Sequence, residues 1–226
     1  SAGFLGVGYD PFSVSSPERP PENTRLAVEP GRLGRAIGLL DELEGEFSRA
    51  GASDRVREHR ALYAKAKRLA TSKRLEAFNI SRESEKTREL YGDDSFGKGC
   101  LLARRLVEAG VTYIEVRSNG WDTHNDNFER IKTLAGGVDR GYAALIADLR
   151  DRGMLDRTMV LWMGEFGRTP RINGRTGRDH YPRVFNLAIS GGGVKGGQVI
   201  GSSTDDGSRV KDRPVKVEDL FSSVCY

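Results

Sequence analysis

The sequence predicts an α/β fold in which a mostly parallel sheet carries helices on its faces. Residues 158–163 form an uninterrupted apolar run, Thr-Met-Val-Leu-Trp-Met, which is typical of a strand covered on both sides. Residues 111–116 are rich in β-branched and aromatic side chains and predict an earlier strand. Between them, residues 128–151 repeat apolar side chains at helical spacing. Strand, helix and strand of these lengths predict a βαβ unit and therefore parallel pairing.

The composition is that of a globular chain with a sizeable core. The chain has 226 residues, of which 37% are hydrophobic, and its charges nearly cancel at a net +4, which argues against intrinsic disorder. The mild excess of basic residues gives no support for a nucleic acid partner. No apolar run approaches the roughly 20 residues that a membrane span needs. Two cysteines are too few for a disulfide scaffold.

The amino-terminal part predicts an arm followed by a helical segment. Residues 1–31 contain five of the eight prolines and are expected to form an extended arm. Residues 32–110 are expected to be helical and to pack on the α/β core. Helical spacing of apolar residues, or a short apolar pair, occurs at about 36–47, 62–70, 73–79 and 100–107, with a polar loop expected over 80–94.

Residues 111–226 are expected to form the α/β core, with a third strand at 184–189. Ligands of open α/β sheets lie outside the carboxyl ends of the strands, which here carry the segments 118–127 and 164–183. The chain has 28 glycines, and eleven of them fall within 164–207. Glycine allows tight turns and close approach of the backbone, so this part of the chain is the predicted functional region.

Two of the three histidines fall in these two segments, each beside an acidic residue. Asp122 and His124 lie in the first segment, and Glu165, Asp179 and His180 lie in the second. Neutral imidazole and carboxylate are ligands that zinc, manganese and iron accept. The sequence therefore predicts a metal site at this edge of the sheet, with positions left open for water or an anion.

Arginines accompany the candidate ligands. Arg168 and Arg178 are candidates for holding an anionic oxyacid group through paired hydrogen bonds. Structural interpretations stay open beside this one. The acid and histidine neighbours could form surface hydrogen bonds, Glu165 could pair with Arg168, and Asp179 could orient His180 instead of binding metal.

No covalent nucleophile is evident. The chain has no G-x-S-x-G turn, and neither Cys100 nor Cys225 has an evident partner base.

Three segments of this sequence resemble a bacterial family known as domain of unknown function 1501. They are residues 120–124 (Gly-Trp-Asp-Thr-His), 163–170 (Met-Gly-Glu-Phe-Gly-Arg-Thr-Pro) and 177–180 (Gly-Arg-Asp-His), and the likeness extends over nearly all of the chain. The resemblance implies a three-layer α/β/α fold of the alkaline-phosphatase-like kind, related to the sulfatases.

The resemblance also implies a ligand set. The wider superfamily uses two metal ions beside a Ser, Thr or Cys nucleophile, and by position Asp122, His124 and His180 look like the ligands of one ion. Zinc or manganese is expected, with calcium as a further option. Glu165-Phe166 stands where the superfamily commonly has an Asp-His pair, so Glu165 would bind a second ion or stabilise the first.

By the same resemblance, the chain corresponds to the carboxyl-terminal part of a larger protein. The missing amino-terminal half would be its partner and would supply the first strand, an acidic ligand and the nucleophile. Export signals are common in that half, so an exported or periplasmic location is expected.

The expected function is that of a metal-dependent hydrolase of phosphate or sulfate esters, inactive as this part alone. Arg168 would contact the oxyanion of the ester substrate. The alternative is a non-catalytic exported structural or binding protein that retains the fold. A carbohydrate-binding or surface-assembly module is a third, weaker interpretation, since the sequence offers no aromatic platform.

Overall fold

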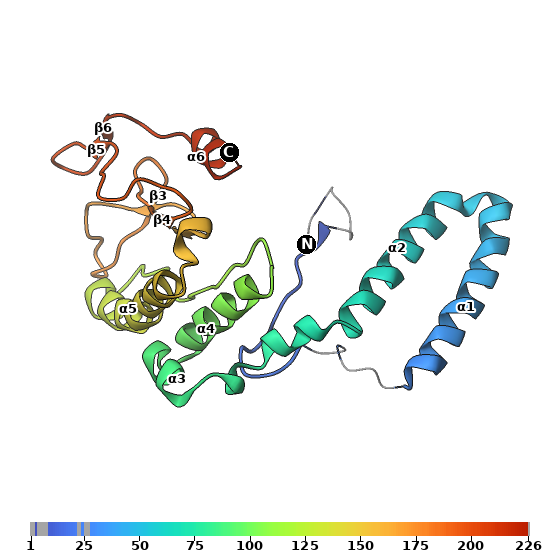
Figure 1. Cartoon of the computed structure of the whole chain (residues 1–226). Coiled ribbons are helices and arrows are strands. Elements are labelled where there is room, and N and C mark those ends of the chain that lie inside the picture. Colours follow the sequence, from blue (N-terminus) through green and yellow to red (C-terminus); the bar gives the residue numbers. More distant parts are fainter. Residues whose placement is uncertain (1–2, 4–8, 22–23, 25–27, 226) are drawn as a thin grey trace. The chain divides into compact units, whose positions relative to one another are not determined.

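The computed structural model describes residues 3, 9–21, 24 and 28–225, and helices dominate it (Figure 1). About 51% of the described residues are helical. The α-helices are α1 (Pro30–Phe47), α2 (Ser53–Ala70), α3 (Glu85–Tyr91), α4 (Ser95–Glu108), α5 (Asn127–Asp151) and α6 (Val217–Cys225). Short 3-10 turns occur at Lys73–Phe78, Ile80–Arg82 and Leu155–Arg157, and a π-helical turn at Ser48–Ala52. Part of the arm predicted over 1–31 lies outside the described residues.

The strands are short and pair only in twos. They are β1 (Met159–Trp162), β2 (Gly167–Arg168), β3 (His180–Tyr181), β4 (Ala188–Gly191), β5 (Ser202–Ser203) and β6 (Val210–Asp212). In the part of the chain that the structure describes, β1 pairs with β4, β2 with β3 and β5 with β6, and each pair is antiparallel.

The predicted α/β fold with a mostly parallel sheet is therefore wrong, and so is the three-layer α/β/α architecture that the resemblance implied. The apolar run at 158–163 does contain a strand, β1, but its partner β4 comes later in the chain and runs antiparallel to it. Trp162 is 51% exposed, so the run is not covered on both faces. Residues 111–116 lie outside every strand that the structure describes. An apolar run predicts an extended segment, but it carries no information about which segment pairs with it or in which direction.

Helical periodicity gave better predictions. The helix expected over 128–151 is α5, and the apolar stripes nearer the amino terminus lie on α1, α2 and α4. The polar segment 80–94 is not a loop throughout, because it contains α3. This helix buries only Tyr91, whose hydroxyl donates a hydrogen bond to Asp148 at 2.9 Å, so its apolar pattern is too sparse to predict it.

By their internal contacts the residues form two compact units. The first comprises residues 1–85 and 105–114. Within it, α1 and α2 form an antiparallel hairpin (Figure 1) in which Glu44 of α1 pairs with His59 and Arg60 of α2. In the same unit Arg105 forms an ion pair with Glu83, and Phe12 packs against Phe78 with ring centroids 6.0 Å apart.

The second unit comprises residues 86–104 and 115–226 and contains the candidate site. Its core lies between α4 and α5, which approach so closely that a Cβ on Gly141 would lie 2.8 Å from the Cα of Gly97. Arg104 is fully buried there, and its Nε lies 2.9 Å from Asp148. Buried apolar residues of α4, of α5 and of the segment after α5 complete this core: Cys100, Leu101, Leu102, Ala103, Val138, Ala144, Leu149 and Met154.

Among the described residues, we find no helix with the length and hydropathy needed to cross a lipid bilayer.

Candidate metal centre

Two loops of the second unit bring the candidate ligands together. The first loop leads into α5 and carries Asp122 and His124. The second loop joins β2 to β3, carries Asp179 and ends at His180, the first residue of β3. Thr123, between the candidate ligands Asp122 and His124 in the sequence, is fully buried. Its carbonyl oxygen accepts a hydrogen bond from the amide of Arg178, at 3.0 Å. This bond joins the two loops directly at the site.

Backbone hydrogen bonds continue this junction. The amide of Asp126 donates to the carbonyl of Arg175 at 3.1 Å, and the amide of Asn127 donates to that of Thr176 at 3.0 Å. Gly177 packs against the first loop so tightly that a Cβ there would lie 1.9 Å from the carbonyl oxygen of His124. Only glycine fits this position, which gives one of the clustered glycines a specific role.

A small hairpin orients the second loop. In the β2–β3 pair, Arg168 stands opposite His180. Beyond the pair, Thr169 and Asp179 exchange two hydrogen bonds: the amide of Thr169 donates to the Asp179 carbonyl at 2.9 Å, and the amide of Asp179 donates to the Thr169 hydroxyl at 3.0 Å. These bonds hold Asp179 and His180 in a fixed register relative to Arg168.

Asp122, His124 and His180 converge on one point. The Oδ1 atom of Asp122 lies 2.9 Å from Nε2 of His180 and 3.0 Å from Nε2 of His124. The two Nε2 atoms lie 3.2 Å apart. The side chains of all three residues are partly or largely exposed, with 61% of Asp122, 32% of His124 and 50% of His180 accessible to solvent.

These three separations fit the donor atoms of one metal ion. Ligand bonds of about 2.0–2.1 Å with donor atoms about 2.9–3.2 Å apart correspond to angles of roughly 90–100° at the ion. The donor set of two imidazoles and one carboxylate is one that zinc, manganese and iron accept. Three ligands on one side leave the remaining coordination positions open toward solvent.

Asp179 lies behind His124 and does not join the three converging atoms. Its Oδ1 lies 2.7 Å from Nδ1 of His124 and accepts a hydrogen bond from Nδ2 of Asn173 at 3.0 Å. Asn173 also donates to the carbonyl oxygen of His124 at 3.0 Å. The carboxylate of Asp179 therefore orients the imidazole of His124, whereas the sequence had left open that it orients His180.

This orientation has an electrostatic consequence. A neutral His124 that donates its Nδ1 proton to Asp179 presents the lone pair of Nε2 toward Asp122 and His180. Lone-pair acceptors at hydrogen-bond distance repel one another unless protons or a cation lie between them. The guanidinium of Arg168, with Nη1 2.6 Å from Oδ1 of Asp122, supplies positive charge beside these atoms, and a bound metal ion would supply it at their centre.

The two carboxyl groups are held ionised. The pKa of Asp122 is lowered to about 2, first by its hydrogen bond with His180 and then by that with Arg168. The pKa of Asp179 is also lowered, first by the hydrogen bond with His124 and then by that with Asn173. Both carboxylates are therefore available, as ligand and as orienting group, throughout the neutral range.

The two arginines have different surroundings. Nη1 of Arg168 lies 2.6 Å from Oδ1 of Asp122, so its guanidinium is at the cluster. Arg178 donates to the carbonyl oxygens of Thr169 and Pro170 at 2.6 and 2.7 Å. Arg178 therefore stabilises the second loop, and only Arg168 lies where an anion beside the cluster would meet it.

The remaining candidates lie elsewhere. In the described part of the chain, the group with metal-ligand spacing consists of Asp122, His124 and His180 and does not include the exposed Glu165. Burial raises the pKa of the Cys100 thiol to about 12, which makes it unreactive at neutral pH.

Sequence reasoning missed two neighbours of the site. The only sequence feature that marks Asn173 is its place before Gly174, a pair of residues typical of a turn, and this does not indicate a role in the site. The Phe166 ring packs against the His180 imidazole with centroids 4.7 Å apart, and it follows Glu165 directly in the segment that was singled out.

Comparison with known proteins identifies the family and adds no further relative. A family model described as "Protein of unknown function (DUF1501)" matches residues 1–226. No curated protein and no solved structure matches the chain significantly. Because the family model covers the whole sequence, the chain belongs to the DUF1501 family.

Proposed function

We propose that this protein binds a divalent metal ion, zinc or manganese, through Asp122, His124 and His180, and that this centre hydrolyses phosphate or sulfate esters. The observation that carries the proposal is the convergence of one donor atom from each of these three residues, at separations of 2.9–3.2 Å. The carboxylate behind His124 supports it, because such a partner typically fixes the imidazole of a metal ligand.

The residues around the cluster suit an anionic ester. Arg168 holds one nitrogen 2.6 Å from Asp122, and a guanidinium has further N–H groups with which to bind the oxygens of a phosphoryl or sulfuryl group. The exposed side of the cluster leaves room for this group and for water. A bound metal ion would polarise the ester oxygen and lower the pKa of a bound water.

A specific observation favours a second candidate, a binding protein without catalytic activity. Glu165 does not belong to the group with metal-ligand spacing, so the described residues supply the ligands of a single ion. A single-metal centre can bind an anion without cleaving it. In this alternative Arg168 and the ion would hold an anionic ligand.

Metal analysis tests the common part of both candidates. The purified chain is dialysed against zinc or manganese, and the bound metal is measured by mass spectrometry. We expect about one ion per chain, lost in His124→Ala and His180→Ala and retained in His59→Ala, which removes the histidine outside the cluster. Undiminished metal in the first two variants would refute the site.

An ester panel then separates the candidates. A metal-loaded version extended by the amino-terminal half that the resemblance implies is assayed on phosphate and sulfate esters beside its Arg168→Ala variant. Hydrolysis that Arg168→Ala reduces on the order of 100-fold supports the hydrolase. Metal binding with no hydrolysis of any ester refutes the hydrolase and favours the binding protein.

A further inference from the structure

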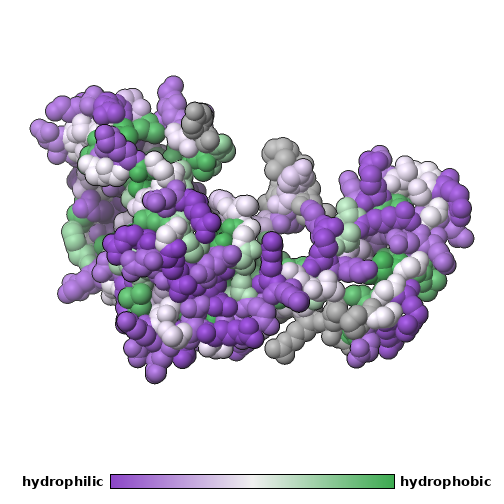
Figure 2. Space-filling view, viewed as in Figure 1, coloured by the Kyte–Doolittle hydropathy of each residue, from purple (hydrophilic) through white to green (hydrophobic). Residues whose placement is uncertain are grey.

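The hairpin of α1 and α2 carries large apolar side chains that are exposed to solvent. Among the residues of α1 and α2 whose side chains are described, only Glu44 and Val56 are buried. Leu39, Leu43 and Phe47 of α1 are 59%, 52% and 65% exposed. Apolar surface is visible on the hairpin between charged side chains (Figure 2).

These side chains form a stripe on α1, and on α2 a single residue, Leu62, corresponds to it. Leu39, Leu43 and Phe47 recur every fourth residue, so they share one side of α1. With roughly 100° per residue, this stripe lies about 100° away from Glu44, which faces α2. On α2, Leu62 is 46% exposed and lies about 120° away from Val56 in the same rotational sense.

The α1 stripe and Leu62 therefore lie on the same side of the hairpin. Because α1 and α2 run in opposite directions (Figure 1), a similar rotation in the same sense turns the stripe and Leu62 toward one face. We call this surface, made by Leu39, Leu43, Phe47 and Leu62, the hairpin face. Two helices with one shared apolar face correspond to half of a four-helix bundle.

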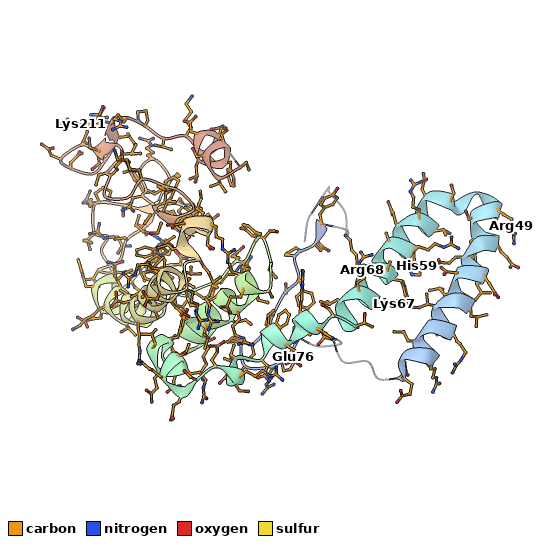
Figure 3. All side chains as sticks on the ribbon, in the orientation of Figure 1. Arg49, His59, Lys67, Arg68, Glu76 and Lys211 are labelled. Carbon is orange, nitrogen blue, oxygen red and sulfur yellow. The ribbon has the colours of Figure 1, made fainter. Side chains whose placement is uncertain are left out.

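The charges of the two helices are complementary. α1 has four carboxylates and two arginines, a net charge of −2. α2 has two carboxylates and six basic residues, a net charge of +4 with His59 neutral. Lys67 and Arg68 lie in its last turn, and His59 lies on the side of α2 near α1 (Figure 3).

This charge pattern selects one symmetric pairing of two hairpin faces. A two-fold axis parallel to the helices places α1 of one copy over α2 of the other, opposite in charge and antiparallel. A two-fold axis across the helices would instead stack α1 on α1 and α2 on α2, like charge on like charge. Isologous pairing of the first kind needs no other partner.

The available area is sufficient for association. Each helix has 18 residues and is therefore about 27 Å long. Two packed helices are about 18–20 Å wide, so the face covers roughly 500 Å² in projection. Two copies would bury about 1,000 Å² in total, the lower end for a specific interface.

We propose that the hairpin face binds the same face of a second copy of this chain, forming an antiparallel four-helix bundle. The proposal does not depend on the metal centre, which lies in the other unit.

Sedimentation equilibrium of the full chain over a range of concentrations tests the proposal. We expect a dimer. We expect Leu43→Lys to raise the dissociation constant of this dimer by about 30-fold or more, because Leu43 would lie at the centre of the interface. Glu42→Gln is the matched control, because it changes the net charge equally on an exposed residue outside the hairpin face. Circular dichroism checks that the variants keep their helices. We expect Leu43→Lys to keep them, because the Leu43 side chain is 52% exposed.

Two results would overturn the proposal. One is a wild-type chain that stays monomeric up to roughly 100 µM. If the hairpin face of that monomer is nevertheless protected from hydrogen exchange, another part of the same chain covers it, and the proposal fails equally. The other is a dimer that Leu43→Lys leaves as tight as the control does, which would assign the interface to a different surface.

Discussion

Replacing Asp179 tests whether this residue orients His124 without binding the metal ion itself. Asp179 touches His124 and Asn173 through the same oxygen, Oδ1, at 2.7 and 3.0 Å. Asp179→Ala removes both hydrogen bonds and the negative charge behind the imidazole. Loss of such an orienting partner typically weakens metal affinity 10–100-fold, and we expect this variant near the upper end.

Asp179→Asn should have a smaller effect. The amide group of Asn173 donates to Oδ1, which favours an asparagine at 179 that keeps its oxygen in this position. The oxygen would still accept from His124, so the tautomer is kept and only the charge is lost. Because the side chain of Asp179 is 50% exposed, solvent screens that charge, and we expect a loss near 10-fold.

The assay is competition for zinc against a chromophoric chelator, at constant pH and ionic strength. Asp206→Asn is the matched control, because the pKa of Asp206 is also lowered to about 2, yet its hydrogen bonds go to Thr204 and Ser208. We expect the order wild type and Asp206→Asn, then Asp179→Asn, then Asp179→Ala. Affinity of Asp179→Ala within twofold of wild type would refute the orienting role.

Two further predictions concern stability. Gly177→Ala should destabilise the chain by about 2 kcal/mol or more, because its Cβ would lie 1.9 Å from the carbonyl oxygen of His124. Gly174→Ala is the control, because a Cβ at that position meets open space. Equal urea midpoints of unfolding for the two variants would contradict this prediction. Glu44 has a pKa lowered from 4.5 chiefly by its hydrogen bond with His59, so the stability it contributes is present above pH 4.5 and is lost as the pH falls through the lowered value. A pH titration of helical circular dichroism should show this loss, and Glu44→Gln should remove that part of the pH dependence; an unchanged acid transition in the variant would contradict it.

The convergence of the site was predictable, but the reason given for it was wrong. His124 and His180 were expected to meet because parallel strands end at one edge of a sheet. They meet instead because backbone bonds from Asp126 and Asn127 join the first loop to the second, and the β2–β3 hairpin sets His180 opposite Arg168. Residue types indicated which side chains would lie together, while the connections between the loops depend on tertiary contacts.

The fold was predictable where periodicity is strong. α5 spans 25 residues with a regular apolar stripe, and its bounds agree with the prediction within about one residue. The strands have two to four residues each, too short for a pattern to specify a partner. Asn173 could not have been identified as a site residue, because its role depends on the position of His124, which is far away in sequence.

The most direct test of the metal centre is X-ray absorption at the zinc edge of the chain loaded with one equivalent of zinc. We expect two imidazole nitrogens and oxygen ligands, all at about 2.0–2.1 Å from the zinc ion, and the loss of one imidazole in His180→Ala. Sulfur ligands at about 2.3 Å, or a spectrum that His180→Ala leaves unchanged, would contradict it.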